Sequence, residues 1–400
     1  MMARMRLVLH IGTEKTGTTL LQDWLYSNQD ELSEQGVFLS DLLGKSNNRK
    51  LVAYFRKDQD DFWTAKRIKT LQDKEKYFAH FLDEFAAEIR EAEKSHHTMI
   101  ITSEHFHSRL LVDAEVGELA GFCRDHFSEV RVLCYLREQS AMRRSQYSTA
   151  VKNGSGESFE EFKPEINEND QYYNYYDLAK RWEKNFGRSS LNLRVYDPRA
   201  FVDEDLRKDF LTAIGIPIDA NRLDFQTQSA NESLKLLAAC AYAAINRAVP
   251  LFTPNGYDPR NRFLKKIAQE VEELNRGEIT DPFAPAIYKR FRESNRKLFV
   301  EYFDGKEIFE RPAKSHRGDP PIEMAQVALI VGELVHKLTA AAGPRLPLDS
   351  DVDLLWDVAL KCDSGESVTR EEALRLLEMA HRSRPNRAAI KSKIEEWRGP

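Results

Sequence analysis

The feature that most limits the fold of this chain is a glycine-rich loop near its N-terminus, placed between an apolar run and a helical pattern. Residues 6–11 (RLVLHI) form a short, nearly continuous apolar run, as expected for a buried parallel strand. Residues 10–22 read HIGTEKTGTTLLQ, with four residues between Gly12 and Gly17 and apolar positions at helical spacing afterwards. A strand, a glycine loop and a helix N-terminus in this order predict an anion-binding loop.

The loop differs from that of nucleotide triphosphatases in the place of its lysine. The triphosphatase pattern is G-x-x-x-x-G-K-[ST], whereas here Thr18 and Thr19 follow Gly17 and the lysine is Lys15. Backbone N–H groups and the two threonine hydroxyls can surround an anion, and Lys15 adds a positive charge. Because the Lys-Ser/Thr pair that handles a terminal phosphate and Mg²⁺ is missing, the pattern favours a monoester-like phosphate without a metal. The alternative is a strand-to-helix turn that binds no ligand.

Further apolar runs alternate with helical patterns along the first half of the chain. Runs typical of strands lie at 36–40, 98–102, 130–136 and 191–196. This alternation predicts an α/β fold of three layers with a central parallel sheet. In such sheets ligands bind beyond the carboxyl ends of the strands, where we expect the glycine loop, Glu104 and Arg137 to meet.

One helical pattern is long and rich in aromatic residues. Residues 73–94 are predicted to form a single helix, with Tyr77, Phe81, Phe85 and Ile89 on one stripe. Aromatic residues at this spacing are far more typical of a core than of a ligand site. We therefore expect the stripe to lie in the core.

The second half of the chain is mostly helical in pattern. The predicted divisions are a P-loop domain at 1–312, a linker at 313–321 and a helical extension at 322–400. The linker is assigned because KSHRGDPP is polar and contains Gly and Pro. In the extension, Ala373, Ala380 and Pro385 resemble the second helix of a tetratricopeptide repeat, which would offer a surface to a protein partner. A plain helical hairpin is the alternative, since only one such unit is visible.

A second candidate for anion binding follows the apolar run at 130–136. In YLREQSAMRRSQY, Arg137 ends the run and Ser145 follows eight residues later on a predicted helix. An arginine can hold a phosphate with two parallel hydrogen bonds, and a serine hydroxyl can add another. Two separate phosphate holders indicate a nucleotide with phosphates at two places. The neighbouring Arg143 and Arg144 are expected to form a solvated helix face.

Together these residues carry a resemblance to a known family. The loop EKTGTT, the R-x7-S pair and the later segments YYDLAKRWEKNFG, LNLRVYDP and DLRKDFLTAIGI resemble bacterial sulfotransferases that use 3′-phosphoadenosine 5′-phosphosulfate. The resemblance covers roughly residues 5–310. It implies that the 5′-phosphosulfate contacts the loop residues Lys15, Thr16, Gly17, Thr18 and Thr19. It implies that the 3′-phosphate contacts Arg137 and Ser145.

Sulfuryl transfer also requires a base that removes the proton of the acceptor. Glu104 lies just after the predicted strand 98–102 and resembles the glutamate of carbohydrate sulfotransferases. The resemblance therefore implies a hydroxyl or amine of a carbohydrate or glycoconjugate as acceptor. His105 is the rival base, with His107 behind it, because small-molecule sulfotransferases have a histidine near this place. Other interpretations of the segment are a helix cap or ion pair at Glu104 and a metal site at H-x-H.

Charge and cysteine content narrow the class of protein. The net charge of −5 gives no general attraction to nucleic acid, so an anion site must be a local basic patch. The four cysteines are far apart and form no C-x-x-C motif, which is typical of reduced thiols in a cytosolic protein. The apolar runs are too short or too charged to span a bilayer. The chain is therefore predicted to be cytoplasmic, without a transmembrane segment.

Two other functions remain open from the sequence. A P-loop kinase or NTPase would use the strand end MIITSE to hold Mg²⁺, although the lysine after Gly17 is missing. A non-catalytic nucleotide-binding protein would act through its C-terminal helices. Asn231 is a further candidate for the nucleotide site, and its alternative is a cap for a helix beginning at Glu232.

Overall fold

The computed structural model divides the chain into two compact units. Its described residues are 4–226, 233–253, 256–271, 274, 281–312 and 388–398. The first unit comprises Met1–Met142, Glu165–Glu232 and Phe283–Pro312, and the second comprises Arg143–Pro164, Ser233–Pro282 and Ala313–Pro400. The predicted domain 1–312 thus contributes to both units. The predicted linker, the tetratricopeptide-like pattern and Asn231 lie outside the described residues.

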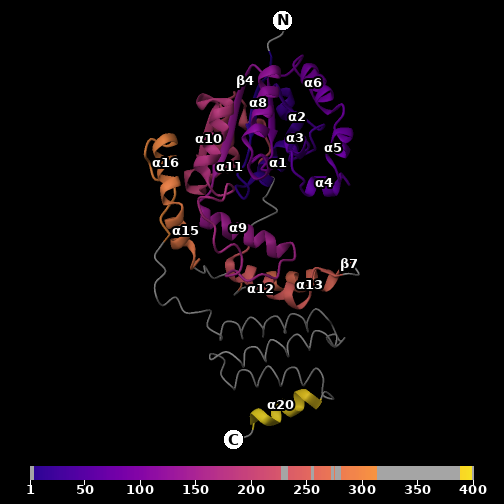
Figure 1. The fold of residues 1–400 in the computed structure, drawn as a ribbon, viewed down its shortest axis with the longest axis vertical. Coiled ribbons are helices and arrows are strands. Elements are labelled where there is room, and N and C mark those ends of the chain that lie inside the picture. The colour runs from indigo at the N-terminus through magenta and orange to yellow at the C-terminus, as the bar shows by residue number, and fades with distance from the viewer. Residues whose placement is uncertain are drawn as a thin grey trace. The chain divides into compact units, whose positions relative to one another are not determined.

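A five-stranded parallel sheet forms the centre of the first unit (Figure 1). Its strands are β1 (Arg6–His10), β2 (Val37–Leu39), β3 (Thr98–Thr102), β4 (Glu129–Leu136) and β5 (Leu191–Val195). Their order is β2-β3-β1-β4-β5, which confirms the predicted α/β class and parallel sheet. β1 lies between β3 and β4, so the loop that follows it begins between the carboxyl ends of these two strands. Ligand crevices of parallel sheets form at such a place.

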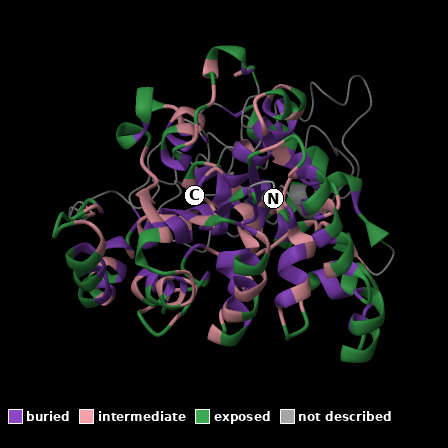
Figure 2. Ribbon diagram, turned by 90° about the horizontal axis from the view of Figure 1, so that it is seen from above, coloured by how far each residue is buried: buried purple, intermediate pink, exposed green. Residues whose placement is uncertain are grey.

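Helices cover both faces of the sheet. Successive strand residues point to opposite faces, so neighbouring side chains of one strand are buried in different cores. Leu7 and Leu9 pack in one core cluster and Val8 in another. The first cluster includes residues of α6 (Phe81–Ala92), α8 (Asp113–His126) and α10 (Tyr175–Phe186). The second includes residues of α1 (Thr18–Ser27) and α11 (Leu206–Ile214). Figure 2 shows buried residues in the strands and on one side of many helices.

Shorter helices complete the first unit. The α-helices are α2 (Gln29–Glu34), α3 (Arg49–Phe55), α4 (Asp61–Ala65), α5 (Leu71–Tyr77), α7 (His105–Arg109), α15 (Ala284–Arg290) and α16 (Arg292–Tyr302). The 3₁₀ turns are η1 (Arg188–Ser190), η2 (Pro198–Ala200), η3 (Val202–Glu204) and η4 (Ala220–Arg222). Among the described residues, no helix is long and apolar enough to pass through a lipid bilayer.

The prediction of one helix over 73–94 is wrong. The chain ends α5 at Tyr77 and starts α6 at Phe81. The break allows Phe78 and Phe81 to pack on the same ring, that of Tyr54, with centroid separations of 5.5 Å each. The predicted core stripe is confirmed for Phe81, Phe85 and Ile89, whereas Tyr77 is exposed.

The described residues of the second unit form helices and one hairpin. Its elements are the continuation of α9 (Gln139–Lys152), then α12 (Leu236–Ala248), β6 (Phe252–Thr253), β7 (Gly256–Tyr257), α13 (Pro259–Gln269) and α20 (Ala388–Arg398). Polar side chains bind the carbonyl end of α9. The Asn246 amide donates to Val151 O at 2.8 Å and the Lys265 amine to the same oxygen at 2.9 Å. These bonds satisfy carbonyls that a helix end leaves without partners.

Candidate active site

The glycine loop extends the sheet before it turns into α1. Ile11 N donates to Leu133 O at 2.9 Å and Thr13 N to Tyr135 O at 2.8 Å, so the start of the loop pairs with β4. Gly12 has a φ of 106°, and a Cβ there would lie 3.2 Å from Glu104 Cα. Glycine at this position therefore lets the segment after β3 lie directly against the loop.

The loop ends at Gly17, and α1 begins directly after it without a side-chain cap. Gly17 occupies the position before the helix with a φ of 71°, and a Cβ there would lie 2.4 Å from Leu206 Cδ2. No side chain caps the first turn of α1. Its backbone N–H groups and the positive end of the helix dipole are therefore available to an anion.

The three threonines predicted to contact the nucleotide differ in their surroundings. Thr16 is buried, and its hydroxyl donates to Thr13 O at 2.6 Å, so this hydroxyl holds the loop together. Thr18 is 5% exposed and Thr19 is exposed, both in the first turn of α1. That these three threonines contact a nucleotide stays a prediction. Because the Thr16 hydroxyl is engaged, Thr16 would make such a contact through its backbone N–H.

Lys15 lies among charged groups of three different strand ends. Burial lowers the pKa of its amine, the charges of Glu14 and Glu104 oppose that change, and the pKa remains below its ordinary value. The guanidinium of Arg137 adds a like charge that also lowers this pKa. The structure thus brings Lys15, Glu104 and Arg137 to the carboxyl edge of the sheet, as the sequence predicts.

Arg137 is fixed at the end of β4 by contacts at both ends of the residue. Its Nη1 donates to Lys15 O at 2.8 Å, and its guanidinium carbon lies 5.4 Å from the ring centroid of Tyr196. The hydroxyl of Tyr175 donates to its carbonyl at 2.7 Å. Arg137 therefore supports the loop directly, in addition to any contact with a ligand.

Ser145 belongs to the second unit, on the part of α9 beyond Met142. It is buried and shares a hydrogen bond of 3.0 Å with the hydroxyl of Ser233. Since Arg137 belongs to the first unit, the predicted Arg137–Ser145 phosphate site stays a prediction.

The prediction that Arg143 lies on a solvated face is wrong. Its side chain is fully buried, with Nε donating to Phe162 O at 2.9 Å and Nη2 to Phe159 O at 2.5 Å. Its guanidinium carbon lies 4.1 Å from the Phe159 ring centroid. The charge is buried because these carbonyls, together with the carboxylate of Asp281 at 3.7 Å, replace water around it. Arg144 is partly exposed, as predicted.

Glu104 stands between β3 and α7, half-buried, and is held by α1. Gln22 Nε2 donates to its Oε2 at 2.7 Å. Although Glu104 occupies the position before α7, its side chain makes no capping hydrogen bond, so the interpretation as a helix cap is wrong. The carboxylate is thus bound to α1 rather than to its own helix.

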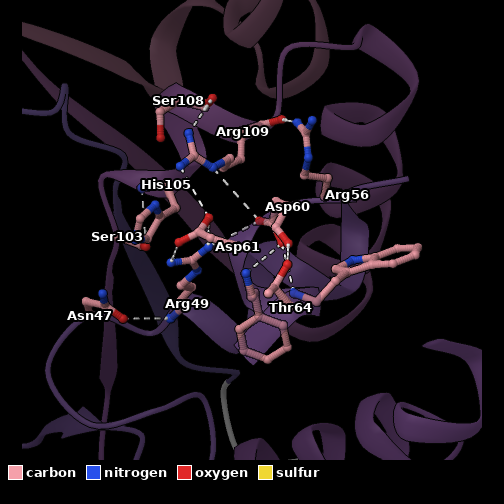
Figure 3. Close-up of polar contacts among 12 residues, drawn as sticks. Asn47, Arg49, Arg56, Asp60, Asp61, Thr64, Ser103, His105, Ser108 and Arg109 are labelled. Carbon is pink, nitrogen blue, oxygen red and sulfur yellow. Dashed lines mark hydrogen bonds and ion pairs between the residues drawn. The ribbon is translucent and has the colours of Figure 1, made fainter. Parts of the chain in front are cut away.

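His105 lies beside a cluster of paired charges from α3, α4 and α7, drawn in Figure 3. Arg49 Nη1 donates to Asp61 Oδ2 at 2.7 Å, and Arg109 Nη2 donates to Asp61 Oδ1 at 3.4 Å. Burial lowers the pKa of His105, the charge of Glu104 opposes it, and Arg49 and Arg109 lower it further. Its buried Nδ1 has no hydrogen-bond partner among the described residues. A neutral imidazole with an unoccupied nitrogen keeps His105 a candidate base.

The other two histidines of this region have structural surroundings. His107 Nε2 donates to Tyr172 O at 2.9 Å, and its Nδ1 accepts from Glu14 N at 3.3 Å, which fixes a neutral tautomer. His10 is fully buried, with Nδ1 2.8 Å from Thr102 Oγ1, and burial lowers its pKa to about 3. Among the described residues, no group of three or more His, Cys, Asp or Glu side chains is placed to hold a metal ion.

Two residues of the site were not predicted from the sequence. Tyr172 donates its hydroxyl to Glu14 Oε2 at 2.7 Å and so ties the loop to the segment before α10. Gln22 is 3% exposed and binds Glu104. A signal for Gln22 was present, because it is a polar residue beside the apolar positions Leu21 and Leu25 of an amphipathic helix.

Comparison with known proteins gives one partial relationship. An uncharacterized protein of Archaeoglobus fulgidus is 32% identical over 221 residues, which cover 53% of this chain and 55% of that protein. The chain therefore spans about half the length of this relative. No family model matches the chain, and no solved structure matches it.

Proposed function

We propose that this protein is a metal-independent sulfotransferase on a P-loop α/β scaffold. It transfers the sulfuryl group of 3′-phosphoadenosine 5′-phosphosulfate to a hydroxyl or amine of a carbohydrate or glycoconjugate in the cytoplasm. The observation that carries the proposal is the position of Lys15. Lys15 stands in the loop before the uncapped N-terminus of α1, and its amine interacts with the charges of Glu104 and Arg137, so the loop and a carboxylate share one edge of the sheet.

The residues present fit an anionic donor. The first turn of α1 offers N–H groups with no side-chain cap, and Gly17 leaves no Cβ in the turn before it. Lys15 adds a positive charge in a half-buried place, where charge interactions are stronger than in water. Arg137 places a second positive charge, its guanidinium, at the neighbouring strand end.

The chain's residues have distinct roles in transfer. The donor supplies an activated sulfuryl group whose bridging oxygen leaves with the nucleotide. Glu104 accepts the proton of the acceptor as its oxygen or nitrogen attacks sulfur. Lys15 and the N–H groups of α1 stabilise the negative charge that develops on the departing phosphate. Most of the rate acceleration then comes from positioning and electrostatics.

The test is a transfer assay with radiolabelled donor sulfate, a chelator and a panel of carbohydrate acceptors carrying free hydroxyls or amines. Labelled acceptor is expected in the presence of the chelator. Phosphoryl transfer from ATP that the chelator abolishes would instead make the protein a kinase. Nucleotide binding without transfer to any acceptor would favour a non-catalytic binding protein.

A further inference from the structure

The contact between Gln22 and Glu104 joins the donor loop to the proposed base. Gln22 lies on the second turn of α1, the helix that begins directly after the loop. It is 3% exposed, and its Nε2 donates to Glu104 Oε2 at 2.7 Å. A buried amide that donates to a carboxylate makes a charge-assisted bond, which is stronger than one between neutral groups.

The backbone on the other side of Glu104 is also fixed. A Cβ at Gly12 would lie 3.2 Å from Glu104 Cα and 3.4 Å from Glu104 Cβ, so the loop lies against the stem of this side chain. Glu104 Oε1, in contrast, accepts no hydrogen bond from the described residues. One carboxylate oxygen is therefore engaged and the other is left to a ligand.

We propose that Gln22 is the positioning residue of the base: it holds Glu104 Oε2 so that Oε1 receives the acceptor proton. This inference rests on the proposed function. In the step, the acceptor proton moves to Oε1 while the acceptor oxygen or nitrogen bonds to sulfur. The bond between sulfur and the bridging oxygen breaks, and its electron pair stays on the departing nucleotide. Because Gln22 is part of α1, the helix that receives the donor also orients the base.

The experiment uses the full chain with four changes. Gln22→Met keeps the size of the side chain and removes the donor. Gln22→Glu places two carboxylates in contact, and like charges at this distance retain a proton to higher pH. The exchange Gln22→Glu with Glu104→Gln restores an amide–carboxylate pair with reversed direction. Gln72→Met is the control, since Gln72 is exposed on α5.

Two readouts separate a positioning role from a structural one. For Gln22→Met, kcat should fall roughly 10- to 100-fold with KM for the donor little changed, as expected when a reacting group is misplaced. For Gln22→Glu, the acidic limb of the pH–rate profile should move to higher pH. As pH rises from 4 to 7, both carboxylates of Gln22→Glu ionise and repel, so the melting temperature of this variant should fall relative to that of Gln22→Met. The exchanged pair should restore the melting temperature but not kcat.

The outcomes distinguish this inference from the proposed function. If the exchanged pair does not recover the melting temperature, or Gln22→Met turns over like Gln72→Met, Gln22 does not position the base. If the exchanged pair recovers stability but the natural chain transfers no sulfate to any acceptor, the proposed function fails, and the positioning role fails with it. A shifted pH–rate profile together with stability recovery supports both.

Discussion

At the scale of single residues, the least expected group is a carboxylate inside the loop that is predicted to bind an anion. Glu14 precedes Lys15, and its charge would oppose a bound phosphate. Its Oε2, however, accepts from Tyr172 OH at 2.7 Å. Burial raises the pKa of Glu14, but the neighbouring hydroxyls of Ser108 and Tyr172 and the charge of Arg109 outweigh it, so the net pKa lies below its ordinary value. Glu14 therefore stays ionised and serves as an anchor of the loop.

Single substitutions can also decide whether Glu104 or His105 is the base. Glu104→Gln keeps the shape of the side chain and removes its basicity, so kcat should fall by roughly 10²–10⁴-fold. Nucleotide affinity should barely change, because Glu104 is assigned no phosphate. Turnover and nucleotide titrations on the same preparation measure both. If Glu104→Gln turns over normally while His105→Ala does not, the base is His105.

Arg137 should give the site its preference for a nucleotide with two phosphates. Adenosine 3′,5′-bisphosphate should raise the melting temperature more than adenosine 5′-phosphate, because at equal concentration the ligand that binds the folded state more tightly stabilises it more. Arg137→Ala should remove most of this difference. Arg296→Ala, which removes an exposed arginine from α16, is the control. Equal shifts from both nucleotides in the natural chain would contradict a 3′-phosphate site.

At the scale of elements, the turn from β1 into α1 depends on Gly17. Gly17→Ala places a methyl group against Leu206 Cδ2 at a φ of 71°, so the Leu206 side chain or the start of α1 must shift in addition to the backbone strain. Gly305→Ala is a matched control, since its φ is 77° and no atom lies within 4 Å of an added Cβ. The control should lose about 1–2 kcal/mol of stability from backbone strain alone. Gly17→Ala should lose more and should also lose nucleotide binding, measured by chemical unfolding and titration. Equal losses would mean that the loop tolerates a side chain.

Some features of the fold could be predicted from sequence patterns, and others could not. The strands were predictable because buried parallel strands are continuous apolar runs, and their carboxyl ends placed Lys15, Glu104 and Arg137 at one edge. The break between α5 and α6 was not, because tertiary packing of Phe78 overrides a helical pattern that continues through it. The burial of Arg143 was not predictable either, since carbonyls from a distant loop replace its water.

At the scale of the whole molecule, buried histidines should make the fold sensitive to acid. Burial lowers the pKa of His10 from 6.5 to about 3, so the folded state binds fewer protons than the unfolded state between these values. Stability from this group is complete above pH 6.5 and falls by roughly 1.4 kcal/mol per pH unit as pH decreases toward 3. His10→Asn removes the titration. Its free energy of unfolding in urea should therefore change less between pH 7 and 4 than that of the natural chain. An identical pH dependence would show that His10 is not the source.

The packing of Phe309 determines where the first unit can be cut. Phe309 is 4% exposed, and its ring centroid lies 5.5 Å from that of Phe299 and 6.0 Å from that of Tyr175. The segment after α16 therefore packs into the same core cluster as the buried residues of α10. A chain ending at Pro312 keeps this contact, and we expect it to fold and to bind the nucleotide.

A chain ending at Tyr302 removes Phe309 and should lose about 3–5 kcal/mol, the usual cost of deleting a buried phenylalanine. Phe309→Ala in the full chain isolates this contribution. Melting curves with and without adenosine 3′,5′-bisphosphate compare the three proteins, because the ligand shift reports an intact loop independently of the loss of stability. If the chain ending at Pro312 unfolds while Phe309→Ala stays folded, residues beyond 312 are needed to close the core, and the predicted separate helical extension is wrong.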